Sequence, residues 1–153
     1  MTRVLRKMIV RRGDKYDVRS GLGDVLRRLS PHSPDESMIE HFARGADYPV
    51  WVVEGTFGDP SEDDCNWEVI GTVAAFMEQK LTHDGGLVAH LEDLVVCREF
   101  EGYGIARMLI DHVKEWAVSE GCYKVVLSCS EEKRGLYEKC GFRQNEISMR
   151  CNL

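Results

Sequence analysis

The sequence predicts one α/β (α+β) domain, built on a central, twisted sheet that is mixed, mostly antiparallel and flanked by about four helices. Two observations carry this prediction. Segments with the alternating or continuous apolar pattern of strands recur along the chain, and segments with the spacing of amphipathic helices lie between them. No internal repeat, low-complexity tract or linker separates a second unit. We therefore expect a single domain over residues 1–153.

The composition limits the kinds of molecule that the protein is expected to bind. With 43% hydrophobic and 30% charged residues, the chain is typical of a globular protein that needs neither disulfides nor metal. A formal charge of -6 argues against general nucleic-acid binding, which needs a basic face. No apolar run is long enough to span a membrane, and the N-terminus lacks the apolar core of a secretory signal. The six cysteines are scattered, so we expect reduced thiols, no metal site and a cytoplasmic protein.

The first predicted elements are a strand and two helices. Alternation predicts a strand over residues 4–11, and the charged residues 12–15 lead into a weakly amphipathic helix that ends near Leu29. Ser33-Pro34-Asp35-Glu36 then offers a hydroxyl cap, a proline at the first helical position and a glutamate that returns the capping bond. The second helix should end near Gly45.

Three strands are predicted next. Residues 48–54 and 68–79 have strand composition and are joined by a loop that contains the acidic residues 59–64, which suggests a hairpin. A polar connection at residues 82–86 leads into a further strand over residues 87–96, whose C-terminal end is mostly apolar.

The apolar period then changes from that of a strand to that of a helix. Residues 104–119 carry an apolar face at helical spacing, and Gly121 supplies the stop signal. A short buried strand over residues 123–129 and a short helix over residues 133–139, ended by Gly141, complete the pattern before an extended C-terminus.

The strand-to-helix junction carries the strongest chemical signal. Gly102-Tyr103-Gly104-Ile105-Ala106 lies where glycines let the backbone approach an oxyanion and where unpaired amides and the helix dipole favour negative charge. Alone the signal is weak, because glycine before a helix is often plain turn chemistry and Arg107 breaks the Rossmann pattern.

In context, the chain resembles the GNAT acetyltransferase superfamily. There the turn reads Gln/Arg-x-x-Gly-x-Gly/Ala and a later tyrosine precedes a Gly-Phe pair, as in Leu136-Tyr137-Glu138-Lys139-Cys140-Gly141-Phe142. Glu78-Gln79-Lys80, Gly86-Leu87-Val88-Ala89-His90-Leu91-Glu92-Asp93 and Gly121-Cys122-Tyr123-Lys124 are similar to the glucosamine 6-phosphate N-acetyltransferase group of that superfamily. The likeness covers residues 48–151 well and the first 47 loosely.

The resemblance implies an acetyl-CoA-dependent enzyme that converts D-glucosamine 6-phosphate to its N-acetyl derivative, a step of UDP-N-acetylglucosamine biosynthesis, by direct transfer in a ternary complex. The residues it assigns to coenzyme A lie at the end of the strand and in the turn: Leu94, Val95, Val96, Gly102, Tyr103, Gly104, Ile105, Ala106 and Arg107. The fourth strand should splay from the fifth, which frees its backbone for the pantetheine arm.

The resemblance also implies the reacting groups. Tyr137 is the candidate acid for the coenzyme A sulfur, and Glu92 is the candidate that assists deprotonation of the amine. The residues assigned to the amino sugar phosphate come from several segments: Lys80, His83, Glu92, Asp93, Tyr123, Lys124 and Arg150. Arg150 is expected from the partner subunit of a homodimer with a shared active site.

Four positions depart from the family pattern. Glu101 stands where Gln or Arg is usual, and its carboxylate would repel a diphosphate unless the side chain turns away. Ser128 replaces an aspartate that orients or deprotonates the amine. Lys133 and Asn152 replace a common asparagine and arginine, which indicates altered phosphate recognition.

Alternatives stay open at this point. The amine could be a polyamine, an arylalkylamine or a protein terminus, or the domain could bind coenzyme A without catalysis as an interaction module. A covalent route through Cys129 or Cys140 is a further alternative, although neither has a histidine nearby in sequence. Cys151-Asn152-Leu153 loosely resembles a peroxisomal address, so a peroxisome-like organelle is the minority expectation for location.

Overall fold

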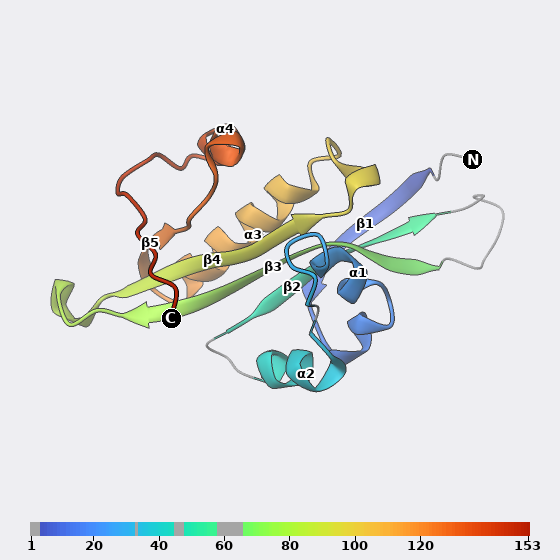
Figure 1. Ribbon diagram of the computed structural model, residues 1–153, viewed down its shortest axis with the longest axis horizontal. Helices are drawn as coiled ribbons and strands as arrows, with labels where there is room; N and C mark the ends of the chain where they lie inside the picture. Colours follow the sequence, from blue (N-terminus) through green and yellow to red (C-terminus); the bar gives the residue numbers. More distant parts are fainter. Residues whose placement is uncertain (1–3, 33, 45–47, 58–65) are drawn as a thin grey trace.

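The computed structural model describes residues 4–32, 34–44, 48–57 and 66–153, and it confirms the predicted fold class (Figure 1). One sheet has the order β1-β2-β3-β4-β5. Its strands are β1 (Leu5–Arg12), β2 (Val50–Phe57), β3 (Trp67–Gln79), β4 (Leu87–Val96) and β5 (Cys122–Val126). Neighbouring strands are antiparallel except β4 and β5, which are parallel, so the sheet is mixed and the predicted β2–β3 hairpin is present.

Helices cover both faces of this sheet. The α-helices in the described part of the chain are α1 (Leu22–Leu26), α2 (Glu36–Arg44), α3 (Ile105–Ser119) and α4 (Glu131–Lys139). Single 3₁₀ turns lie at Lys15–Val18, His83–Gly85 and Arg98–Phe100. In Figure 1, α3 crosses one face while α1 and α2 lie on the other.

Two hydrophobic clusters hold the layers together, one on each face. Val53 packs in the larger cluster with Leu109 of α3, whereas its neighbour Val52 packs in the smaller one with Leu22 of α1. All four side chains are buried. Successive strand residues point to opposite faces, so the continuous apolar run of β2 fills both clusters at once.

The prediction of a single helix that ends near Leu29 is wrong. The structure has a 3₁₀ turn at Lys15–Val18 and then the five-residue α1, separated at Gly21. Gly21 has φ +107, a left-handed conformation that glycine adopts without steric cost, and it ends one helical segment before the next begins. The helical pattern of the sequence therefore predicted one helix where the backbone forms a 3₁₀ turn and a separate short α-helix.

Several predicted ends moved by a few residues. Strand β5 ends at Val126 rather than 129, and α4 begins at Glu131 rather than 133. The cap of α2 is the Asp35 side chain, which accepts from the Met38 amide at 2.9 Å; Ser33 and the acidic loop at 59–64 lie outside the described residues. The extended C-terminus forms no strand within the described part of the sheet.

One partly buried ion-pair network ties β1 to β2 and the first turn. Arg11 donates to Glu54 at 2.7 and 2.9 Å and to Asp17 at 3.0 Å. Asp17 is 1% exposed and also accepts from the Asp14 amide at 2.7 Å. Hydrogen bonds to both carboxylates raise the pKa of Arg11 above its ordinary value, so the guanidinium stays charged and holds the two acids together.

Candidate active site

The parallel strands β4 and β5 pair over part of their length and then separate. Their ladder ends at His90 and Val126, whereas β4 continues to Val96. Beyond this point the chain after β5 turns away toward α4 (Figure 1). The expected splay of these two strands is therefore confirmed, and it opens a space along the last residues of β4.

A β-bulge lies in β4 beside this opening. Thr72 pairs with Val95 and Ala74 with Glu92, so two residues of β4 stand opposite one residue of β3. One of the two is Asp93, whose φ of +51 is unusual for a residue with a side chain. A bulge bends its strand and re-aims the neighbouring side chains. Glu92 and Asp93 consequently do not follow the simple alternation that the sequence predicts for an ideal strand.

A cavity of about 690 Å³, here called the glycine-turn cavity, fills the opening between the end of β4, the turn before α3 and helix α4. Most of the residues that the resemblance assigns to coenzyme A line it: Leu94, Val95, Val96, Gly102, Gly104, Ile105, Ala106 and Arg107. Tyr103 does not line it. Tyr103 is 52% exposed, and its ring packs edge-on against Phe100 with ring centres 6.0 Å apart.

The glycines of the turn leave room for a ligand. Gly102 and Gly104 have φ values of +86 and +80, and a Cβ built on either would have no heavy atom within 4 Å. Gly104 precedes α3, and in the described chain no side chain caps that helix start. The first amides of α3 therefore face an open space with the positive end of the helix dipole behind them, which fits an anionic group such as a diphosphate.

The carboxylate of Glu101 at this turn is paired with a cation. Arg28 Nη2 donates to Glu101 Oε1 at 2.7 Å, and Arg28 also donates to the carbonyl of Val96. The Arg28 hydrogen bond is the largest of the effects that hold the pKa of Glu101 below its usual value. Arg28 lines the glycine-turn cavity, as do Arg107 and Lys133. Nothing in the sequence around Arg28 marked it as a site residue.

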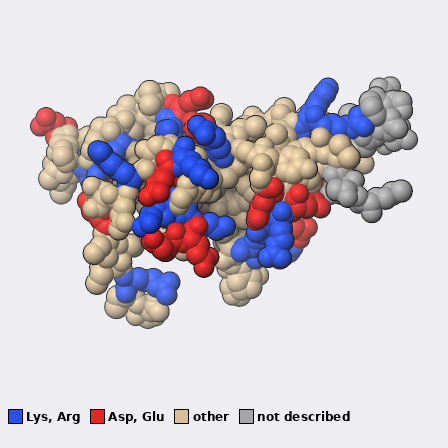
Figure 2. Space-filling model, turned by 90° about the horizontal axis from the view of Figure 1, so that it is seen from above, with Lys and Arg blue, Asp and Glu red and all other residues tan. Residues whose placement is uncertain are grey.

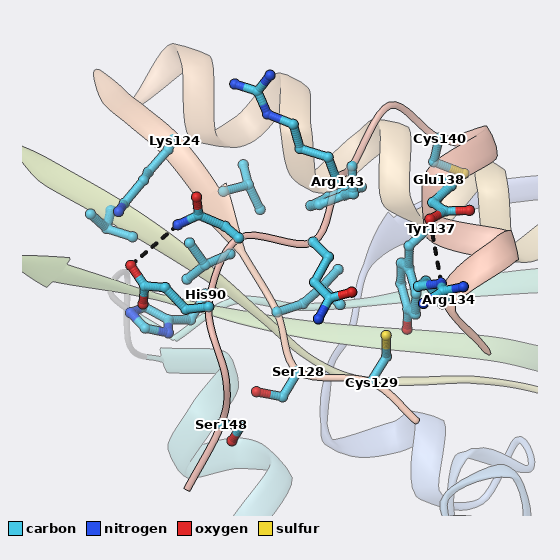
Figure 3. Close-up of a pocket in the computed structure, with 18 of the residues that line it drawn as sticks. His90, Lys124, Ser128, Cys129, Arg134, Tyr137, Glu138, Cys140, Arg143 and Ser148 are labelled. Atoms are coloured by element: carbon cyan, nitrogen blue, oxygen red, sulfur yellow. Dashed lines mark hydrogen bonds and ion pairs between the residues drawn. The ribbon is translucent and has the colours of Figure 1, made fainter. Parts of the chain in front are cut away.

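A second cavity, of about 1020 Å³, extends along β5 and under the C-terminal segment, and it is here called the β5 cavity (Figure 3). Of the residues assigned to the sugar phosphate, Lys80, Glu92 and Lys124 line it. Other cations along its wall are Lys114, Arg134 and Arg143. The same lining contains the acids Glu78, Glu92, Glu131, Glu138 and Glu146, so cations for a phosphate and carboxylates for an ammonium group are both present.

The remaining residues assigned to the sugar phosphate lie elsewhere. The His83 and Tyr123 rings contact each other with centres 5.1 Å apart beside the β5 cavity, and Lys124 lies over the Tyr123 ring. Asp93 lines the glycine-turn cavity instead. Arg150 lines neither cavity within this chain and is exposed.

A polar relay on the wall of the β5 cavity was missed from the sequence. Glu78 accepts from Lys80 at 2.6 Å and lies 2.8 Å from His90 Nε2. The His90 ring stacks on Phe76, with centres 4.3 Å apart. The hydrogen bond from Lys80 lowers the pKa of the Glu78 carboxyl group most, and the hydrogen bond with His90 lowers it further. The strand alternation could have shown that residues 78 and 80 share a face, but not that β4 brings His90 to them.

The two cavities meet. Residues that line both are Glu92, Ser128, Cys129, Ser130 and Tyr137. Figure 3 shows Ser128 and Cys129 on the segment that leaves β5, and Tyr137 on α4 facing that segment. A group reaching through the glycine-turn cavity would therefore contact a group bound in the β5 cavity at this junction.

Two titratable groups at the junction have shifted pKa values. Burial raises the pKa of Tyr137, and electrostatic interactions with neighbouring groups, among them Glu92, add to the effect. Burial, followed by the Asp93 carboxylate, raises the pKa of Glu92. Tyr137 thus keeps its proton at neutral pH, and the Tyr137 hydroxyl has no hydrogen-bond partner among the described residues. An acid and a weakly basic carboxylate stand at the same place.

The surface charge and the arrangement of possible metal ligands do not point to a further site in the described part of the chain. On the face shown in Figure 2, Lys and Arg side chains lie interspersed with Asp and Glu. Within residues 4–32, 34–44, 48–57 and 66–153, no group of three or more His, Cys, Asp and Glu side chains is arranged to hold a metal ion. In that same part of the chain, no helix combines the length and apolar composition that crossing a bilayer requires.

Comparison with known proteins points to one family. Residues 24–142 match the acetyltransferase (GNAT) family. The sequence is 32% identical over 139 residues to glucosamine 6-phosphate N-acetyltransferase 1 of Oryza sativa subsp. japonica, which covers 87% of this chain and 79% of that protein.

Solved structures agree with the sequence match. The crystal structure of glucosamine-6-phosphate N-acetyltransferase from Arabidopsis thaliana superposes with a TM-score of 0.83 at 27% identity, covering 96% of this chain and 99% of that one. An acetyltransferase of Trypanosoma brucei gives a TM-score of 0.79 at 30% identity, covering 96% of this chain and 100% of that one.

Proposed function

The chain belongs to the acetyltransferase (GNAT) family, and from that membership we propose that it transfers the acetyl group of acetyl-CoA to the amine of D-glucosamine 6-phosphate. The product is N-acetyl-D-glucosamine 6-phosphate. The observation that carries the proposal is the junction at which the glycine-turn cavity meets the β5 cavity, whose lining carries both cations and carboxylates. The names of the rice and Arabidopsis relatives support the choice of sugar phosphate as the amine.

Acetyl-CoA supplies the acyl group as an activated thioester. The chain's part is to bind the diphosphate at Gly102 and Gly104 through backbone amides and the N-terminus of α3. The edge of β4 beyond His90, left without β5 as a partner, binds the extended arm by strand-like hydrogen bonds. This assignment puts the thioester end at the junction with Tyr137.

The β5 cavity receives the acceptor. Lys80 and Lys124 are the cations we assign to the phosphate, and their charges make the site prefer glucosamine 6-phosphate over glucosamine. Lys80 donates to Glu78 at 2.6 Å, and this carboxylate partly neutralises its charge. We therefore assign the larger part of the phosphate binding energy to Lys124. Glu92, at the junction, is assigned to the amine.

Direct transfer needs a neutral amine and a proton for the departing sulfur. Glu92 is the group that we assign to accept the ammonium proton, and its raised pKa, caused mainly by burial, supports this assignment because it makes the carboxylate a better base. Tyr137 keeps its hydroxyl proton and donates toward the sulfur. Ser128 cannot act as an anion at this junction, which leaves Glu92 as the assigned base.

We also propose that two copies form a dimer through their C-terminal segments. Ile147, Met149 and Leu153 are 84, 88 and 121% exposed and alternate with polar residues, the pattern of a strand that buries one face. Strand β5 lies at the edge of the sheet in the described chain. A second copy would cover these side chains and bring Arg150 to its partner's phosphate. Light scattering of wild type and of the Ile147→Glu, Met149→Glu double variant tests this, and a monomeric wild type contradicts it.

The activity is tested by thiol release from acetyl-CoA with glucosamine 6-phosphate, glucosamine and a set of phosphate-free amines. The proposal expects turnover with glucosamine 6-phosphate and a kcat/KM for glucosamine that is lower by at least about 10²-fold, since charge-assisted phosphate contacts are lost. A preference for phosphate-free amines contradicts the substrate. No thiol release with any amine contradicts catalysis.

A further inference from the structure

Arg28 connects three segments that are far apart in the sequence. It lies just after α1, donates to the carbonyl of Val96 at the end of β4, and donates to Glu101 at 2.7 Å before the glycine turn. Its partners lie 68 and 73 residues further along the chain. The three segments together form one wall of the glycine-turn cavity.

The pairing does not seal Arg28 away from the cavity. Its side chain is 33% exposed and that of Glu101 is 53% exposed. A guanidinium has five N–H donors in a planar fork, so the bonds to Val96 and Glu101 leave donors for a further acceptor. Arg28 lines the same cavity as Gly102 and Gly104, the turn to which we assign the diphosphate.

From this geometry we infer that Arg28 is a binding residue for the diphosphate of coenzyme A and that Glu101 holds its guanidinium at the glycine turn. The inference rests on the proposed function for the identity of the ligand. It assigns to the segment after α1 the positive charge that the family pattern carries at position 101 where that residue is Arg.

The charges of the pair explain why an acid is tolerated at the turn. An unpaired carboxylate next to a diphosphate is repelled, and this is the effect expected from Glu101 by itself. The Arg28 hydrogen bond keeps Glu101 ionised, so the pair has no net charge, and the guanidinium lines the cavity. Arg28 therefore cancels one unfavourable charge and offers planar, paired donors that match phosphate oxygens.

The test is calorimetric binding of three probes: coenzyme A, dephospho-coenzyme A and pantetheine. Arg28→Met should raise the Kd of coenzyme A and of dephospho-coenzyme A alike by about tenfold or more, because both carry the diphosphate. Pantetheine lacks it and should bind within about twofold of wild type. Arg27→Met is the matched control, because Arg27 pairs with Asp24 on α1 and does not line the cavity.

Glu101→Gln provides the second half of the test. Glutamine keeps an acceptor for Arg28 but removes the opposing charge, so it should tighten coenzyme A, and it should restore part of the binding lost in Arg28→Met. If Arg28 only ties the α1 loop in place, Arg28→Met will weaken pantetheine as much as coenzyme A. If Arg28 only neutralises Glu101, Arg28→Met will leave coenzyme A binding unchanged when it is made in the Glu101→Gln background. Either result overturns the inference.

These outcomes are separable from failure of the proposed function. A wild-type protein that binds coenzyme A but releases no thiol with glucosamine 6-phosphate contradicts the reaction, and the variant comparison still decides the role of Arg28. A wild-type protein that binds none of the three probes overturns both.

Discussion

Replacing Tyr137 by phenylalanine removes one oxygen from the junction of the two cavities. The hydroxyl is a weak acid there, because its ordinary pKa of about 10 is raised further by burial. Complete proton transfer from this hydroxyl to the departing thiolate is therefore not favoured. The hydroxyl therefore acts mainly by a hydrogen bond to the developing charge, worth about 1.5–3 kcal/mol, so kcat should fall roughly 10- to 100-fold.

Steady-state thiol release with acetyl-CoA and glucosamine 6-phosphate measures this loss, which should be constant from about pH 7 to 9 because the hydroxyl stays protonated. The free energy of unfolding should change by less than about 1 kcal/mol, since the hydroxyl lacks a partner among the described residues. Tyr16→Phe makes the same atomic change on an exposed ring and should have no effect. An unchanged kcat in Tyr137→Phe would remove this residue from the reaction.

Three further changes test the fold and the site. Arg11→Met should lower the free energy of unfolding by about 3–5 kcal/mol in urea titrations, because it strands the buried Asp17, whereas Arg19→Met, which breaks an exposed pair, should cost under about 1 kcal/mol. Glu92→Gln should lower kcat yet raise stability at pH 7. Because the pKa of Glu92 is raised in the folded state, the protonated side chain stabilises the wild-type fold at low pH, and this stabilisation is lost as pH rises through the folded pKa. Denaturant unfolding of wild type and variant at pH 4 and pH 7 should therefore show the stability gain of Glu92→Gln at pH 7 and a smaller gain at pH 4. Gly104→Val forces a β-branched residue to φ +80 and puts its side chain toward the cavity, so coenzyme A binding should weaken more than tenfold in calorimetry while circular dichroism shows a folded protein.

Local patterns predicted most elements of the fold. The apolar spacing of residues 104–119 and the glycine at residue 121 predicted α3 to within one residue. Both signals are local, because the residues of the buried face and the stop signal all lie within or next to the helix itself. The alternation and apolar runs of the strands gave the sheet in the same way. The first helix failed because a weak amphipathic pattern does not reveal that Gly21 takes φ +107 and separates the 3₁₀ turn from α1.

The sequence by itself located the glycine turn before a helix, because a turn and the helix start that follows it are adjacent in the chain. The candidacy of Tyr137 came from the resemblance of residues 136–142 to the GNAT pattern. Only the tertiary structure decided how those pieces meet. The end of the β4–β5 ladder at His90 opens the cavity, and the fold brings Arg28 to Glu101 across 73 residues. A charge that looks repulsive in the sequence is thereby paired, since electrostatic energy depends on distance in space and no local pattern carries that distance.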